Sequence, residues 1–190
     1  MERQFVCIVS GLPRSGTSMM MRMLEAGGMP LLTDGLRQAD DDNPQGYYEF
    51  EPVKKTGTAH EWLPAAQGKA VKIIYRLLYD LPDGYDYRIV FMQRKLDEVL
   101  ASQQKMLDRK GEKGSSLGSD QLAGLFRKEL VHVGTWLSQR PSFTVHEVSY
   151  NELLADPRPR LAGVDEFLGG GLDLDAMAAV VDARLYRNRG

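Results

Sequence analysis

Near its N-terminus the chain has a short apolar segment followed by a glycine-containing loop and a predicted helix, and this pattern limits the folds that it can adopt. Residues 5–9 form an unbroken apolar run rich in β-branched side chains, which predicts a strand buried on both faces in a parallel sheet. The loop is GLPRSGTS, residues 11–18, and a pattern with helical spacing begins within it. The backbone N–H groups of such a loop and the N-terminus of the following helix attract anions. We therefore predict a phosphate-binding loop, with a purely structural tight turn as the alternative.

The composition of the loop narrows the ligand. GLPRSGTS has the outline of the nucleotide-binding pattern G-x-x-x-x-G-K-S/T, but Thr17 stands at the lysine position. That lysine serves the β- and γ-phosphates of a nucleoside triphosphate, so the loop disfavours ATP and GTP. Its cation is Arg14, whose guanidinium can fork onto two oxygens of a tetrahedral anion.

A second pattern follows another buried strand, predicted at residues 87–92. Arg94 comes directly after this strand, and Ser102 follows eight residues later on a predicted helix. Eight residues span about 2.2 helical turns, so the two side chains can converge. Because ligands of parallel sheets gather at the carboxyl ends of the strands, Arg94 should lie near the loop. The alternative is an exposed arginine and an unrelated serine on the helix surface.

Through these two patterns the chain resembles the sulfotransferases that use 3′-phosphoadenosine 5′-phosphosulfate. The resemblance is to a short, bacterial-type member of that family. Their 5′-phosphosulfate loop carries a proline, a basic residue, a small residue, a glycine and two hydroxyl residues, as GLPRSGTS does. Their arginine and serine that hold the 3′-phosphate match Arg94 and Ser102, and VSYNELLADP resembles a late segment of the family. The resemblance implies that the co-substrate is bound by Pro13, Arg14, Ser15, Gly16, Thr17, Ser18, Arg94 and Ser102.

The resemblance also implies transfer of a sulfonate to a hydroxyl or amine, which needs charge stabilisation and a general base. Arg14 would stabilise charge. Lys72 matches a family lysine whose neighbouring histidine is missing here and would approach the bridging oxygen, but a lysine early in a strand can equally be structural. Members that act on protein tyrosine or glycans often use a glutamate after the loop, and Glu49 is the first candidate for the base. Asp34 and His60 are the next candidates. Glu49 can equally be a first-turn helix acid.

Strand and helix patterns alternate along the chain. They predict an α/β fold of three layers, in which a mostly parallel sheet of about five strands carries helices on both faces. The resemblance implies that this is the P-loop NTPase-like fold of sulfotransferases, and we expect residues 1–190 to form a single domain. The predicted strands are residues 5–9, 29–32, 71–75, 87–92 and 142–149. The predicted helices are one closed by Gly27, then 52–62, 96–107, 122–137, 158–168 and 174–183, with a loop at 110–120.

Composition limits the partners. The net charge of −2 and the pI of 5.9 argue against a nucleic-acid or membrane-surface role, so a small-molecule or glycan acceptor is expected. With three histidines and one cysteine, no metal site is expected. No signal peptide and no apolar run of about 20 residues is seen, so a cytoplasmic location is predicted. The oligomeric state stays open.

Two other functions are compatible with these patterns. The first is a small-molecule kinase, which requires binding of ATP and Mg²⁺ despite the missing lysine. The second is a non-catalytic protein that binds 3′-phosphoadenosine nucleotides.

Overall fold

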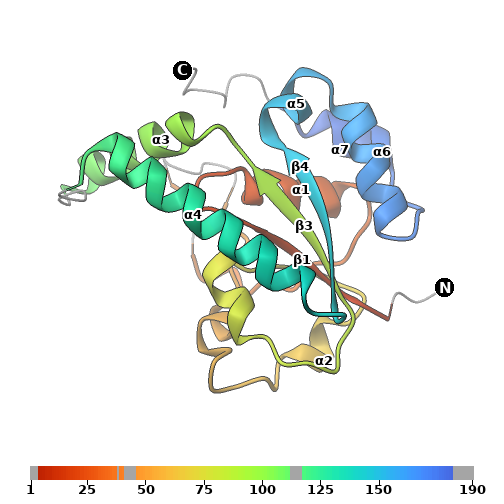
Figure 1. The fold of residues 1–190 in the computed structure, drawn as a ribbon. Helices are drawn as coiled ribbons and strands as arrows, with labels where there is room; N and C mark the ends of the chain where they lie inside the picture. Colours follow the sequence, from red (N-terminus) through yellow and green to blue (C-terminus); the bar gives the residue numbers. More distant parts are fainter. Residues whose placement is uncertain (1–3, 38, 41–45, 112–116, 182–190) are drawn as a thin grey trace.

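The computed structural model describes residues 4–37, 39–40, 46–111 and 117–181 (Figure 1). Its sheet has four parallel strands in the order β2-β1-β3-β4. The predicted α/β fold with a parallel sheet is confirmed, but the sheet has four strands instead of five. The strands are β1 (Val6–Gly11), β2 (Ala70–Lys72), β3 (Tyr87–Gln93) and β4 (Phe143–Ser149).

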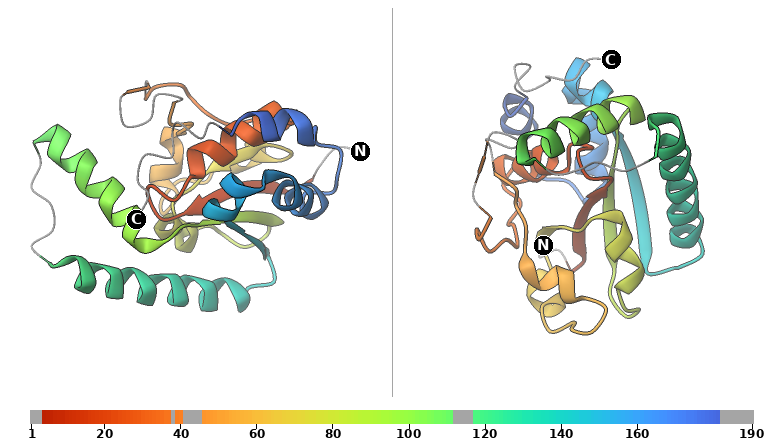
Figure 2. Two further views of the ribbon diagram at one scale, coloured as in Figure 1. Left: turned by 90° about the horizontal axis from the view of Figure 1, so that it is seen from above. Right: turned by 90° about the vertical axis from the view of Figure 1, so that its left-hand side faces the viewer.

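Helices cover both faces of the sheet, as predicted (Figure 2). One face packs against α1 (Thr17–Ala26), α5 (Tyr150–Ala155), α6 (Pro157–Phe167) and α7 (Leu174–Ala179). The other face packs against α2 (Leu63–Ala66), α3 (Leu96–Lys110), α4 (Ser119–Ser138) and the 3-10 helices η1 (Glu51–Lys55) and η2 (Tyr75–Asp80). Helices α3 and α4 extend beyond the sheet as an antiparallel pair (Figures 1 and 2).

The central strand β1 shows why the apolar run folds as it does. Cys7 and Val9 point into the core beneath α1, whereas Val6 and Ile8 point into the core on the opposite face. All four side chains are fully buried, so successive residues of β1 contribute in turn to the cores on the two faces of the sheet.

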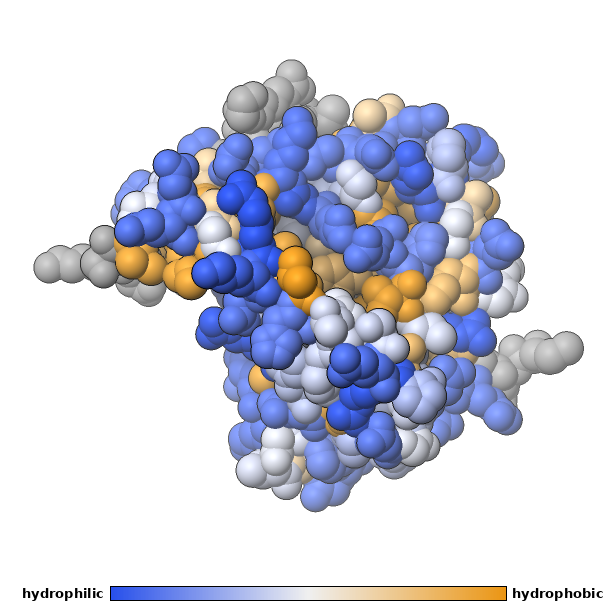
Figure 3. Space-filling view, viewed as in Figure 1, coloured by the Kyte–Doolittle hydropathy of each residue, from blue (hydrophilic) through white to orange (hydrophobic). Residues whose placement is uncertain are grey.

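The molecular surface is mainly polar. Hydrophilic residues cover most of the face seen in Figure 3, and hydrophobic residues are exposed there in small separate groups.

The predicted strand at residues 29–32 is wrong. This segment makes a single bridge between Leu31 and Ala70, although two backbone bonds flank it, from Ala70 N to Pro30 O and from Leu32 N to Ala70 O, both 2.8 Å. A ladder cannot extend because Pro30 has no N–H to donate and β2 is three residues long. The strand predicted at 71–75 is also shorter, since η2 begins at Tyr75.

The predicted helix at residues 52–62 is interrupted. It forms only η1 and, after a turn, α2 begins at Leu63. Thr56 Oγ1 donates to the carbonyl of Val53 at 2.6 Å, and Thr58 Oγ1 donates to the carbonyl of Lys55 at 3.2 Å. These hydroxyls compete for the carbonyls that a continuing helix would use, and Gly57 between them adds flexibility.

The other predicted helices lie close to their expected positions, at α1, α3, α4, α6 and α7. Part of the loop predicted at 110–120 and the end of the helix predicted at 174–183 lie outside the described residues. Among the helices that the structure describes, none combines the length and apolar character needed to cross a bilayer.

Candidate functional site

The GLPRSGTS loop connects β1 to α1 at the carboxyl edge of the sheet. Ser15 N donates to the carbonyl of Leu12 at 3.1 Å, and both Arg14 (φ 71°) and Gly16 (φ 101°) adopt left-handed conformations. At Gly16 a Cβ would lie 2.3 Å from Cδ2 of Tyr150, so only glycine is accommodated. The loop therefore approaches the segment after β4 closely.

The start of α1 is prepared for an anion. Within the described part of the chain, no side chain caps this helix and no acid lies in its first turn. Its first N–H groups therefore have no partner within the helix and face the loop. Ser15 Oγ is buried and, among the described residues, has no hydrogen-bond partner. A bound phosphate or sulfonate oxygen would satisfy both kinds of group.

The structure brings the two sequence patterns together. Arg14 Nε donates to Ser102 Oγ at 2.9 Å, and Arg94 Nη1 donates to the carbonyl of Arg14 at 3.1 Å. The basic side chain of the loop thus points toward α3 and its buried serine. Arg14, Arg94 and Ser102 form one cluster at the carboxyl ends of β1 and β3.

Arg94 is held by residues for which the sequence alone predicted no role. Its Nε donates to Glu98 Oε2 at 2.9 Å, and Asn151 Nδ2 donates to Glu98 Oε1 at 2.8 Å. The guanidinium lies 4.4 Å from the centre of the Tyr150 ring. Tyr150 and Asn151 directly follow β4, so their place at the carboxyl end of a predicted strand was the signal available in the sequence.

Lys72 ends β2 and lies beside the start of α1. Its Nζ is 3.4 Å from Ser18 Oγ, contacts the carbonyl of Tyr47 and is 3.9 Å from Glu49 Oε1. Burial lowers the pKa of Lys72 from its ordinary 10.5 to about 8. This lysine therefore exchanges a proton much closer to neutral pH than a surface lysine does.

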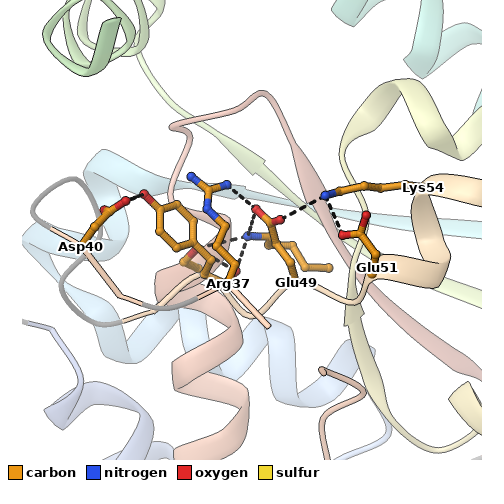
Figure 4. Close-up of polar contacts among 8 residues, drawn as sticks. Arg37, Asp40, Glu49, Glu51 and Lys54 are labelled. Carbon is orange, nitrogen blue, oxygen red and sulfur yellow. Dashed lines mark hydrogen bonds and ion pairs between the residues drawn. The ribbon is translucent and has the colours of Figure 1, made fainter. Parts of the chain in front are cut away.

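Glu49 is surrounded by cations (Figure 4). Arg37 Nη1 lies 2.7 Å from Glu49 Oε1, and Lys54 Nζ lies 3.8 Å from Glu49 Oε2. With Lys72, three basic side chains lie within 4 Å of one carboxylate. The GYYEFE sequence places aromatic residues on both sides of Glu49 along the chain, but its carboxylate is set among these charges. Glu51, which begins η1, occupies the first-turn position instead.

The two other candidate bases are placed differently. Asp34 accepts hydrogen bonds from the backbone N–H of Glu51 at 2.5 Å and of Leu36 at 3.0 Å. These two bonds lower the pKa of Asp34, which makes it a weaker base. His60 is exposed in the turn before α2. Among the described residues, no group of three or more His, Cys, Asp or Glu side chains is arranged to hold a metal.

A cavity of about 240 Å³ lies next to Glu49. Its walls come from the segment that follows α1 and include Thr33, Gly35, Arg37, Ala39, Gly46, Tyr47, Tyr48 and Glu49. Through Glu49 and Lys72 the cavity is linked to Ser18 and so to the loop. The Lys72 side chain thus connects the cavity wall with the start of α1.

No protein-family model and no curated protein matches the sequence. Several solved structures resemble the fold, and two of them, each at 16% identity, are sulfotransferases. Sulfotransferase STF1 from Mycobacterium tuberculosis H37Rv has a TM-score of 0.60, over 96% of this chain and 72% of that chain. The sulfotransferase domain from the curacin biosynthetic pathway has a TM-score of 0.54, over 93% of this chain and 77% of that chain. The chain thus has the α/β fold of these bacterial sulfotransferases.

Proposed function

We propose that this protein transfers a sulfonate from 3′-phosphoadenosine 5′-phosphosulfate to a hydroxyl or amine of a small molecule or glycan. The observation that carries the proposal is the meeting of Arg14, Arg94 and Ser102 beside the uncapped start of α1. The uncapped helix start and the basic cluster of Arg14 and Arg94 offer two places for anionic groups, which suits a ligand that is charged at both ends. The sulfotransferase fold supports the same assignment.

In this proposal the loop holds the 5′ end of the donor. The N–H groups of residues 15–18 and the Ser15, Thr17 and Ser18 hydroxyls contact its oxygens, while Pro13 stiffens the loop and Gly16 allows the close turn. Arg94 and Ser102 bind the 3′-phosphate. Because the Arg14 side chain points to Ser102, we assign its guanidinium to the 3′-phosphate as well. Lys72, beside Ser18, serves the sulfonate end.

The transfer forms a bond from the acceptor oxygen or nitrogen to sulfur and breaks the bond from sulfur to the 5′-phosphate oxygen. The acceptor proton passes to Glu49, which lines the cavity. When the Lys72 amine is protonated, it stabilises the negative charge that develops on the leaving oxygen. Its lowered pKa also allows it to give up a proton to that oxygen.

Calorimetry of the purified protein with three ligands tests the donor site. We expect binding of 3′-phosphoadenosine 5′-phosphate, and binding of adenosine 5′-phosphate that is at least about tenfold weaker. Arg94→Gln should remove this difference. Arg158→Gln, which removes an exposed arginine paired with Asp175, is the matched control and should not.

Three outcomes separate the alternatives. Tight binding of the third ligand, ATP with Mg²⁺, and indifference to the 3′-phosphate would favour the kinase. Selective donor binding without transfer to any acceptor, unchanged by Glu49→Gln, would favour the non-catalytic binding protein. Selective binding with transfer that Glu49→Gln abolishes supports the sulfotransferase.

A further inference from the structure

The cavity beside Glu49 is small, and two charged side chains, Arg37 and Glu49, form part of its wall. Its volume of about 240 Å³ is below the roughly 300–1,000 Å³ of pockets that hold drug-sized ligands, so it suits a molecule with one ring. Tyr47 and Tyr48 provide aromatic walls, and Arg37 and Glu49 provide charge. These four side chains therefore define which acceptors the cavity can hold.

The Arg37 guanidinium lies against the ring of Tyr47. Its guanidinium carbon lies 3.3 Å from the centre of the Tyr47 ring, and the Tyr47 hydroxyl donates to Asp40 at 2.7 Å and 2.8 Å. Arg37 is nevertheless 39% exposed, so its donors are accessible from the cavity side. A guanidinium held flat on a ring keeps its fork in one plane, which suits a carboxylate or phosphate.

Three cations lie within 4 Å of the Glu49 carboxylate, and Arg37 is the nearest of them. Lys72 and Lys54 lie 3.9 Å and 3.8 Å from its oxygens, in addition to Arg37. The neighbouring acids have partners of their own, since Glu51 pairs with Lys54 at 2.7 Å and Asp34 accepts backbone N–H groups. If Arg37 turned to another anion, Glu49 would still lie beside two lysines.

From this geometry we propose that Arg37 selects acceptors with an anionic group, a carboxylate, phosphate or sulfate, next to the hydroxyl or amine that is sulfonated. The incoming anion replaces Glu49 on the Arg37 fork and thereby frees Glu49 Oε1 to accept the acceptor proton. A neutral acceptor leaves the 2.7 Å pair intact and finds this oxygen occupied. The inference rests on the proposed function, because it assigns the acceptor of the same site.

The test compares two ring compounds of nearly equal shape, 2-hydroxybenzoate, whose carboxylate lies next to its hydroxyl, and the neutral 2-hydroxybenzamide. Each is titrated by calorimetry with saturating 3′-phosphoadenosine 5′-phosphate, which blocks the loop as a second anion site. We expect the benzoate to bind at least about tenfold more tightly to the wild type. Arg37→Met should remove the preference, Arg37→Lys should keep part of it, and the surface control Arg158→Met should keep all of it.

Equal binding of the two compounds, binding of neither, or a preference that survives Arg37→Met overturns the inference. Thermal unfolding of each variant shows whether it is folded. Failure of the donor proposal is seen separately, as absence of selective binding of 3′-phosphoadenosine 5′-phosphate. In that case the two titrations are repeated without nucleotide, and Arg37→Met still decides whether the anion binds at this cavity.

Discussion

Two arginine–carboxylate pairs in this molecule have similar lengths and opposite surroundings. Arg94 and Glu98 lie 2.9 Å apart with side chains only 7% and 2% exposed, whereas Arg37 and Glu49 lie 2.7 Å apart with side chains 39% and 21% exposed. The first pair belongs to the side that we propose holds the donor, here called the donor side, at the carboxyl ends of β1, β3 and β4. The second belongs to the side that we propose holds the acceptor, here called the acceptor side, in the segment between α1 and η1.

The difference in exposure between the two pairs indicates which of them a ligand can displace. Asn151 and Tyr150 fix the buried pair on the donor side, so its geometry is set before a ligand arrives. The exposed pair on the acceptor side is held by contacts that a ligand can replace. A fixed donor side and an exchangeable acceptor side agree with the proposed function, in which one co-substrate is always the same and a second molecule must enter.

The largest expected effect tests the rigidity of the donor side. Gly16→Ala should lower the free energy of unfolding by about 3 kcal/mol, since it combines left-handed backbone strain with a clash against Tyr150. Gly28→Ala is the control. Gly28 also has a positive φ (90°), but no described atom lies within 4 Å of the position that an added methyl group would take, so about 1 kcal/mol is expected. Equal losses in urea unfolding would show that Tyr150 moves aside.

The next effect compares the two carboxylates directly. Glu98→Gln should cost about 3 kcal/mol of stability because it leaves Arg94 buried without its counter-ion. Glu49→Gln should cost less than about 1 kcal/mol, since its pairs are more exposed. Both values come from guanidinium chloride unfolding, and a Glu49 variant as damaged as the Glu98 variant would remove the distinction between the two sides.

Lys72 lies between the two sides and gives a pH effect. Because folding lowers its pKa to about 8, the unfolded chain binds more protons between pH 8 and pH 10.5, and stability rises with pH across that window. Relative to Lys72→Met, the wild type should gain about 1.5 kcal/mol between about pH 7.5 and about pH 9.5. Parallel stability curves for the two proteins would mean that Lys72 titrates like a surface lysine.

The smallest effect sharpens the assignment within the donor side. If Arg14 serves the 3′-phosphate, Arg14→Met should reduce the preference for 3′-phosphoadenosine 5′-phosphate over adenosine 5′-phosphate by about tenfold. If it serves the 5′ end instead, the variant should weaken both ligands equally and leave their ratio unchanged. Calorimetry of the four combinations distinguishes the two roles.

The nearness of Arg94 to the loop could be predicted because the patterns behind it are local. The apolar run at residues 5–9, the loop and the eight-residue interval from Arg94 to Ser102 each depend on backbone periodicity and on the rule that parallel strands end at one edge. Two secondary-structure predictions were wrong where contacts with other residues determine the conformation of the segment. The strand predicted at 29–32 lacked a partner long enough to pair with, and the helix predicted at 52–62 lost its carbonyls to two threonine hydroxyls.

The α/β class, the central buried strands and the glycine loop could thus be predicted from the amino-acid sequence, because hydrophobic periodicity and glycine conformation act over a few residues. The directions of the charged side chains could not. In the folded chain Arg14 points to Ser102, Asn151 and Tyr150 hold Arg94, and Arg37 shares Glu49 with two lysines. Charges separated by tens of residues meet only after the sheet has set the spacing between its strand ends, and no local pattern encodes that spacing.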